Sequence, residues 1–251
     1  PNLGASMMSS GRTCTYGLIT PSVNNPFFAD FVEHCQSRLA GMGYYLTLSI
    51  YREKLDEFKN QLDQLLGARR VDGLIIIPTH DPDLAGILST TAGCNIPMVL
   101  LGRGLFDHIH WVSIDFEQGA RRLALHLLEL GHRRIVFLYG ITGRRNPTQA
   151  IFDGRLVGLE HAMHEHGLSM SKSSLVHCGS SMQEGYKAAL EIFRRPEQPT
   201  AIFAINDLLA LGAMQAAREL GLRVPEDVSI VGFDNIPLSA FFGLTTAGCS
   251  M

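Results

Sequence analysis

Short apolar runs alternate with longer stretches of helical period along nearly the whole chain. A continuous run such as GLIII at residues 73–77 is typical of a strand that is covered on both faces of a parallel sheet. Apolar residues that recur three and four positions apart predict helices between these runs. The pattern predicts strands at residues 16–20, 44–50, 73–77, 97–101, 111–114, 134–139, 175–177, 201–205 and 228–233, and helices at residues 26–40, 55–66, 84–91, 116–130, 152–166, 183–194 and 207–220.

The predicted strands and helices fall into two similar series that join near Gly131. Parallel strands joined by right-handed helical crossovers form doubly wound sheets. We therefore expect an α/β protein with two Rossmann-like, doubly wound lobes, an N-terminal lobe over residues 14–130 and a C-terminal lobe over residues 131–244. In such sheets a ligand site lies at the carboxyl ends of the strands.

The first predicted helix follows Asn25, and Pro26 suits its first turn. Its apolar residues recur at three- and four-residue spacing, so that they share one face of the helix. These residues are Phe28, Phe31, Val32, Cys35 and Leu39.

Polar side chains collect just beyond the last apolar residue of several predicted strands. Because the carboxyl ends of parallel strands meet at one edge of a sheet, we expect these residues from both lobes to point toward one cleft. Arg155 lies near the start of one helix, and two phenylalanines lie at the start of another. The candidate ligand-binding residues are Ser22, Phe27, Phe28, Asp115, Arg155, Asn206 and Asp234.

These residue types suit a polyhydroxylated ring. Carboxylates accept hydrogen bonds from neighbouring hydroxyls, a guanidinium donates in a fork, an amide does both, and a phenyl face covers apolar C–H surface. Each residue also has a purely structural interpretation. Asn206 is a typical helix N-cap, Asp115 and Asp234 are typical turn residues, and one of Phe27 and Phe28 is expected in the core. Only the convergence of the set favours a binding site.

The composition is that of a globular protein and excludes intrinsic disorder, since 46% of the 251 residues are hydrophobic and 18% are charged. With 21 basic and 24 acidic residues the formal net charge is −3, so we expect these residues alone to bind DNA poorly. Five cysteines without a C-x-x-C pair favour a reducing, cytoplasmic location. We find no signal-peptide pattern and no long apolar run, so we expect neither secretion nor membrane insertion.

Several other chemistries lack their sequence signatures. No G-x-G-x-x-G follows a strand, and neither a phosphate-binding G-x-x-x-x-G-K-[ST] loop nor a G-x-S-x-G motif occurs. His161, His164 and His166 lack a matched set of carboxylates or cysteines, which favours a solvated helix end over a metal site. We therefore expect no metal, no cofactor and no catalytic residue.

Six motifs occur in a fixed order along nearly the whole chain. They are GLI with NPFF at residues 17–19 and 25–28, RVDG at 70–73, LGHRRI at 130–135, RLVG at 155–158, NDLLALG at 206–212 and VPEDVSIVGFD at 224–234. Any one of them is weak evidence, but six in order are specific. The set resembles the effector-binding core of bacterial transcription regulators of the lactose-repressor (LacI/GalR) type.

This resemblance implies two Rossmann-like lobes of the periplasmic-binding-protein type that close on a small effector in the cleft between them. It also implies a homodimer and a hinge that couples effector binding to operator affinity. The family's ligand positions correspond to Asp115, Arg155, Asn206 and Asp234, and to the region of Phe27 and Phe28.

The chain departs from the family pattern in one wall of the pocket and at both ends. An aromatic residue that is common in the family is replaced by Ser180. Residues 1–13 resemble the family's hinge segment, with Ser6 in place of an arginine and Met8 in place of the leucine that wedges into the DNA minor groove. We expect the family's helix-turn-helix to be missing before Pro1, and residues 245–251 to begin a crossover back to the N-terminal lobe.

We expect a non-enzymatic sensor, the ligand-sensing and dimerisation core of a DNA-binding repressor. A sugar is the expected effector, and a purine or another small polar metabolite stays open. Operator DNA would be bound by the helix-turn-helix outside this sequence, and no membrane partner is expected. The alternative is a periplasmic sugar-binding protein for uptake, which shares the two-lobed architecture. A third class, an α/β enzyme with Asp115 or Asp234 as general base, has no supporting motif.

Overall fold

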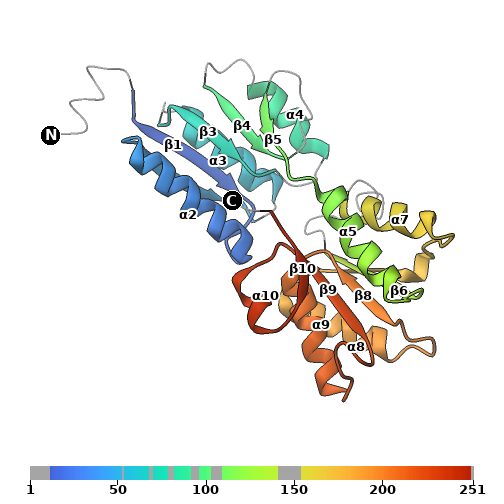
Figure 1. Ribbon diagram of the computed structural model, residues 1–251. Coiled ribbons are helices and arrows are strands. Elements are labelled where there is room, and N and C mark those ends of the chain that lie inside the picture. Colours follow the sequence, from blue (N-terminus) through green and yellow to red (C-terminus); the bar gives the residue numbers. More distant parts are fainter. Residues whose placement is uncertain are drawn as a thin grey trace. The chain divides into compact units, whose positions relative to one another are not determined.

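The computed structural model describes residues 12–52, 54–67, 70–78, 82–91, 96–102, 109–140 and 154–249. The chain divides into two compact units, unit 1 over Pro1–Ile114 and unit 2 over Asp115–Ser250. In the described residues each unit contains a five-stranded sheet whose strands all run parallel (Figure 1). The prediction of an α/β protein with two doubly wound sheets is confirmed.

Unit 1 has the strand order β2-β1-β3-β4-β5. The chain moves from β1 to β2 in one direction and then crosses to β3 and β4 in the other, so right-handed crossovers put α2 on one face and α3 and α4 on the opposite face. The elements are β1 Thr15–Thr20, α2 Pro26–Gly41, β2 Tyr45–Ile50, α3 Leu55–Gly67, β3 Gly73–Ile76, α4 Pro82–Thr91, β4 Met98–Leu101 and β5 His110–Val112.

The core of unit 1 lies between its sheet and the helices α3 and α4. Phe58 and Leu62 of α3 are fully buried in one hydrophobic cluster with Ile19 of β1. Tyr51, which follows β2, lies in the same cluster, and its hydroxyl donates a hydrogen bond to the carbonyl oxygen of Ile77 at 3.0 Å. A buried tyrosine hydroxyl needs such a partner, so this bond makes the burial of the ring favourable.

Helix α2 forms where the sequence predicts it. Asn25 caps it by accepting a hydrogen bond from the backbone N–H of Phe27 at 3.0 Å, and Pro26 occupies its first turn. No residue of α2 is buried, although its apolar residues share one face. In the described residues it is the one helix on its face of the sheet, so no neighbouring helix covers its sides. The partly exposed residues include Phe28, Phe31, Val32, Cys35 and Leu39.

Unit 2 has the strand order β10-β9-β8-β6-β7. Helices α5 and α7 pack against each other on one face of this sheet, and α8 and α9 pair on the other (Figure 1). Every residue of β8 and β9 is buried. The elements are α5 Phe116–Glu129, β6 Ile135–Gly140, α7 Gly154–Glu165, a 3-10 turn Lys172–Ser174, β7 Leu175–Cys178, α8 Met182–Phe193, β8 Ala201–Ala204, α9 Asp207–Glu219, β9 Ser229–Phe233, α10 Pro237–Phe241 and β10 Thr245–Ala247.

The boundary between the units differs from the predicted one. The predicted lobes meet near Gly131, whereas the units divide between Ile114 and Asp115. The helix in between, α5, packs against α7 and therefore belongs to unit 2. Residues 245–247, which we expected to begin a crossover, form β10, the strand beside β9 in unit 2. In the described residues no helix has the length and hydropathy needed to cross a membrane.

Candidate functional site

Arg155 is the second residue of α7 and is held in one orientation by three neighbours. Its Nη1 donates a hydrogen bond to the carbonyl oxygen of Ile205 at 3.0 Å, directly after β8. Its guanidinium carbon lies 4.6 Å from the centre of the Phe116 ring and 5.5 Å from that of the Phe233 ring. Both distances are in the range of cation–π contacts. The guanidinium is therefore fixed at the carboxyl-end edge of the unit 2 sheet.

The place of Arg155 depends on a close approach of α7 to α5. A Cβ atom at Gly158 would overlap the backbone of α5, at the carbonyl oxygen of Glu117 and the amide nitrogen of Arg121. Residues three apart share a helix face, so this contact puts Arg155 beside the first turn of α5, where Phe116 lies. The R-x-x-G spacing thus has a physical reason: the glycine permits the helix contact that sets the arginine.

Asp115 is the N-cap of α5, and its Oδ1 accepts a hydrogen bond from the backbone N–H of Gln118 at 2.9 Å. The side chain is exposed. The structural alternative to a ligand-binding role for Asp115 was a turn residue. In the structure this residue is a helix N-cap. In the described residues the second carboxylate oxygen accepts no hydrogen bond, which leaves it able to accept one from a ligand.

Asn206 is the N-cap of α9, which confirms the structural interpretation of this residue. Its Oδ1 accepts a hydrogen bond from the backbone N–H of Leu209 at 2.8 Å, and its Nδ2 donates to the carbonyl oxygen of Ser180 at 3.3 Å. The side chain is only 7% exposed. The amide thus joins α9 to the segment where the family's aromatic residue is replaced by serine.

Asp234 follows β9 with a positive φ of 113°, a conformation that residues other than glycine rarely adopt. Its backbone N–H donates to the carbonyl oxygen of Ala247 on β10 at 2.7 Å. The side chain is half-buried. The backbone of Asp234 is therefore constrained in a rare conformation, so this residue is not an ordinary turn aspartate.

The four predicted residues of unit 2 come together around Arg155. Asp115 adjoins Phe116, Asn206 adjoins Ile205 and Asp234 adjoins Phe233, and each of these three neighbours contacts the arginine. One edge of the sheet thus carries a guanidinium, an amide and two carboxylates beside aromatic rings. This arrangement can donate and accept several hydrogen bonds at once and cover an apolar ring face.

The predicted residues of unit 1 lie at the carboxyl end of β1. Ser22 Oγ accepts a hydrogen bond from the backbone N–H of Asn24 at 3.0 Å. The rings of Phe27 and Phe28 meet edge to face with their centres 5.3 Å apart. Both rings are half-buried, so the expectation that one of them is a core residue is wrong. Met8, the predicted hinge residue, lies outside the described residues.

Cys178, the last residue of β7, is not a candidate nucleophile. Burial raises the pKa of its thiol to about 12, and the nearby charge of Glu184 adds to the shift. Its Sγ donates to the carbonyl oxygens of Tyr139 and Gly179 at 3.6 and 3.3 Å. A thiol that stays protonated at neutral pH does not supply the reactive thiolate.

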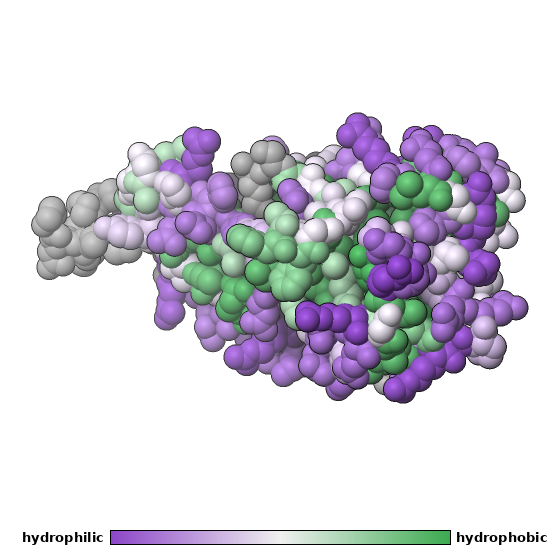
Figure 2. Space-filling model, turned by 60° about the horizontal axis from the view of Figure 1, so that its bottom comes forward, coloured by the Kyte–Doolittle hydropathy of each residue, from purple (hydrophilic) through white to green (hydrophobic). Residues whose placement is uncertain are grey.

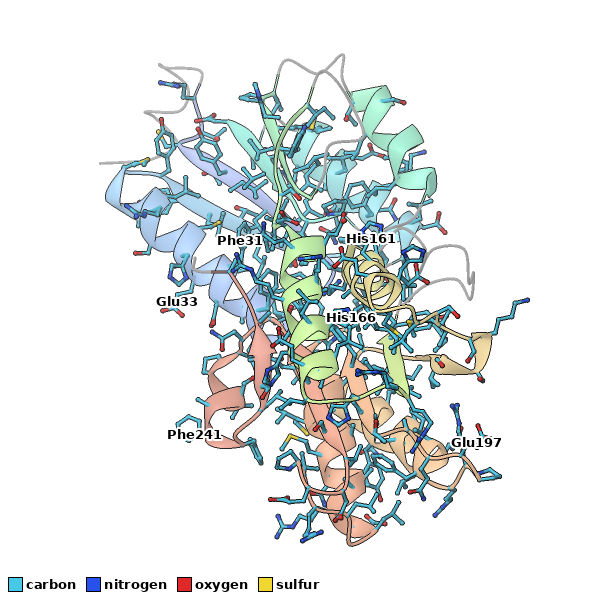
Figure 3. All side chains as sticks on the ribbon, turned by 45° about the vertical axis from the view of Figure 1, so that its right-hand side comes forward. Phe31, Glu33, His161, His166, Glu197 and Phe241 are labelled. Carbon is cyan, nitrogen blue, oxygen red and sulfur yellow. The ribbon has the colours of Figure 1, made fainter. Side chains whose placement is uncertain are left out.

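Two histidines, His161 of α7 and His166 directly after this helix, are exposed and make ordinary surface contacts (Figure 3). His161 Nδ1 lies 3.0 Å from Glu117 Oε1, and His166 Nδ1 lies 2.9 Å from the carbonyl oxygen of Ala162. Within the described ranges no three histidine, cysteine, aspartate or glutamate side chains are grouped so that they could hold a metal ion.

Two residues of the site are absent from the predicted set. The sequence pattern places Phe116 in a helix and Phe233 in a strand, although each adjoins a candidate aspartate. Phe233 is 3% exposed, and its ring centre lies 5.8 Å from that of Phe116. An aromatic residue next to a strand-end acid is the signal that could have identified them.

Residues 13–247 match the family described as periplasmic binding proteins and sugar binding domain of the LacI family. A transcriptional repressor with a helix-turn-helix, PurR of Proteus mirabilis, is 34% identical over 98% of this chain and 71% of its own length. The lac repressor dimer bound to operator and an anti-inducer has a TM-score of 0.83 at 28% identity, over 98% of this chain and 84% of that chain. A LacI-family regulator of Enterococcus faecium with bound ribose has a TM-score of 0.76 at 26% identity, over 92% and 82%.

The family match covers most of the chain, and the repressor relative is aligned over more than two thirds of its length. Three of the six motifs, RLVG, NDLLALG and VPEDVSIVGFD, lie on the elements that build the site around Arg155. This chain therefore belongs to the LacI family of transcriptional regulators and contains its effector-binding core.

Proposed function

We propose that this chain binds a sugar as its effector and that effector binding changes the affinity of the protein for operator DNA. The effector is bound by Asp115, Arg155, Asn206 and Asp234 of unit 2 together with Ser22, Phe27 and Phe28 of unit 1, in a cleft between the two lobes. Binding favours one arrangement of the lobes, and the difference in effector affinity between the arrangements limits the change in operator affinity.

The observation that carries this proposal is the fixed guanidinium of Arg155. An arginine that already lies between two aromatic rings, with one N–H on the Ile205 carbonyl, loses little freedom when it binds a ligand. Its neighbours supply two carboxylates and an amide, which suit vicinal hydroxyls. A sugar offers such hydroxyls on most of its ring carbons, whereas a purine offers them on none.

Ser180 also favours a sugar over a flat heteroaromatic ring. A purine gains much of its binding energy from stacking between aromatic faces. The family's aromatic residue at this wall is a serine here, and its carbonyl oxygen is bonded to Asn206. A purine effector would have to bind without that stacking partner.

We further propose that the active form is a homodimer to which α10 contributes. Phe241 at the end of α10 is 85% exposed, Phe242 is 57% exposed and Leu238 is 41% exposed. Figure 3 shows Phe241 on the outer side of this helix, and Figure 2 shows hydrophobic side chains reaching the surface between polar ones. Adjacent exposed phenylalanines are typical of an interface between protein chains.

The DNA-binding part of the proposal rests on the relatives and on the hinge-like residues 1–13. Met8 takes the place of the leucine that enters the minor groove, and operator DNA is bound by a helix-turn-helix beyond this sequence. A repressor acts where the chromosome is, so we propose a cytoplasmic location. The alternative of sugar uptake loses support because the curated relatives are repressors, and these relatives also favour a sensor over an enzyme.

A ligand screen tests the effector class. Thermal unfolding of the purified chain is measured with monosaccharides including ribose, with disaccharides and polyols, and with purine bases. We expect one sugar or a closely related group to raise the midpoint, since a ligand that binds only the folded state stabilises it. A rise with purines alone would overturn the sugar assignment and leave the sensor assignment in place. Turnover of a sugar by the purified chain would overturn the sensor assignment.

A further inference from the structure

Asp207 is the first residue of α9 and is fully buried, although it is an acidic residue. It stands next to Asn206 of the candidate site but is not part of that site. A buried carboxylate is unfavourable unless hydrogen bonds compensate for the lost water. The partners of Asp207 therefore indicate what it does.

Three groups from the segment after β9 donate hydrogen bonds to the Asp207 carboxylate. They are the backbone N–H of Ile236 at 2.8 Å, Ser239 Oγ of α10 at 2.7 Å and Thr246 Oγ1 of β10 at 2.5 Å. Burial raises the pKa of Asp207, and these hydrogen bonds act in the opposite direction. The N-terminus of α9 also favours negative charge at this point.

The sheet makes room for this carboxylate at Gly232. A Cβ atom there would overlap Asp207 Oδ1 and lie 3.1 Å from its Cα. The glycine of the motif V-G-F-D is Gly232, two residues before Asp234. It lies where the carboxylate of Asp207 packs against β9. Asp207 therefore packs closely against the strand that directly precedes the candidate ligand residue Asp234.

The segment that Asp207 holds has an unusual backbone. Asp234 and Asn235 both have positive φ, 113° and 54°, although neither is glycine. Thr246 Oγ1, which donates to Asp207, also accepts a hydrogen bond from the backbone N–H of Asn235 at 3.3 Å. Residues in such conformations persist only where the surroundings fix them, and they cluster at functional sites.

We infer that Asp207 is a positioning residue of the effector site, because it fixes the backbone of residues 234–236 and so sets the direction of the Asp234 carboxylate. This inference rests on the proposed function, in which Asp234 contacts the effector. Asp207 itself has no role in contacting the ligand. One dipeptide, Asn206–Asp207, thus caps α9 and arranges the loop of a second ligand residue.

Amide hydrogen exchange of the full chain without ligand tests the positioning directly. The reporter is the N–H of Asp234, because it is bonded to Ala247 and not to Asp207. In Asp207→Asn we expect its exchange to accelerate about tenfold or more relative to the amides of α5. The milder Thr246→Val keeps the carboxylate and should give a smaller acceleration. Asp227→Asn, an exposed acid of the same unit, is the matched control. Unchanged exchange at Asp234 in both Asp207→Asn and Thr246→Val would overturn the inference.

A rescue experiment separates positioning from a merely structural role. Glycine adopts positive φ without steric cost, so Asn235→Gly should relieve the need for Asp207. Isothermal titration with ribose should show affinity reduced about tenfold in Asp207→Asn and partly restored in Asp207→Asn/Asn235→Gly. Loss of affinity without any rescue would show that Asp207 acts through general stability and would overturn the inference.

The same titrations distinguish failure of the inference from failure of the proposed function. If Asp234→Ala binds ribose as the unchanged chain does, the assignment of Asp234 is wrong, and if the unchanged chain does not bind ribose, ribose is not the effector. The exchange rates at Asp234 then still decide whether Asp207 fixes this loop.

Discussion

The guanidinium carbon of Arg155 lies 4.6 Å from the centre of the Phe116 ring, so a residue of α7 is held by the first residue of α5. Cation–π contacts of this kind contribute about 0.5–2 kcal/mol, depending on how far they are desolvated. The contact orients an arginine that the sequence assigns to the ligand site. It also links the packing of two helices to effector binding.

Phe116→Leu should weaken effector binding through Arg155. Leucine keeps an apolar side chain at this position but removes the ring quadrupole, so we expect a loss of about 0.5–1 kcal/mol in binding free energy. A double-mutant cycle with Arg155→Ala, read by calorimetry, checks the mechanism. If Phe116→Leu weakens binding equally with and without Arg155, the ring does not act through the arginine.

Gly158→Ala should destabilise unit 2, because the added Cβ would overlap the backbone of α5. Overpacking against backbone typically reduces the free energy of unfolding by about 1–3 kcal/mol. The matched control is Gly41→Ala in α2, where a Cβ meets nothing within 4 Å. Chemical denaturation should show a gain of up to about 1 kcal/mol for the control. Equal stability of the two variants would contradict the close helix contact.

Asp72 should make the stability of unit 1 depend on acid pH. Its carboxylate accepts hydrogen bonds from Thr13 N, Thr13 Oγ1 and Cys14 N at 2.8, 2.9 and 2.9 Å. Burial acts to raise the pKa of Asp72, but these bonds and the charge of Arg12 outweigh it and lower the pKa below the ordinary value of 3.8. The stabilisation is therefore present above pH 3.8 and is lost as the pH falls through the lower, folded-state pKa.

Denaturation of the unchanged chain and of Asp72→Asn at a series of pH values tests this expectation. The difference in unfolding free energy should be constant between about pH 5 and 7 and should shrink toward about pH 3. Asp63→Asn, an exposed change on α3, should show a much smaller difference throughout. A difference for Asp72→Asn that does not change with pH would contradict the assigned hydrogen bonds.

Phe241→Ser should weaken the proposed dimer. Removing a ring that becomes buried at an interface is expected to raise the dimer dissociation constant about tenfold or more, which corresponds to about 1.4 kcal/mol. Sedimentation equilibrium measures this constant. Leu130→Ser removes a similarly exposed apolar side chain from the end of α5 and should leave it unchanged. Equal effects of the two substitutions would contradict the proposal that α10 contributes to the dimer interface.

The strands of both sheets could be predicted because they are rich in apolar and β-branched residues. Such runs indicate a strand whatever the surrounding sequence. It missed α10 and β10, which have five and three residues, because elements this short have no detectable period. It placed the boundary between the units after α5 because a helix carries no local sign of which sheet it covers. Packing of α5 on α7 decides that question.

The candidate site was predictable where a rule of topology applies. Asn206 and Asp234 were predicted because polar residues after parallel strands share one edge of a sheet, and Asp115 because it follows β5, a strand of the unit 1 sheet. Phe116 and Phe233 were missed because their contact with Arg155 requires the helix approach at Gly158. The network of Asp207 joins residues 29, 32 and 39 positions apart, so no local pattern could reveal it.

The central claim is that the site around Arg155 binds the effector, and the effector-induced shift in thermal unfolding tests it most directly. The sugar found in the screen is added to the unchanged chain, to Arg155→Ala and to Arg218→Ala, an exposed arginine of α9 in the same unit. We expect the ligand-free variants to unfold cooperatively. At a ligand concentration about 100 times the dissociation constant, the unchanged chain and Arg218→Ala should gain about 2.7 kcal/mol, and Arg155→Ala should gain almost nothing. A full shift in Arg155→Ala would contradict the account.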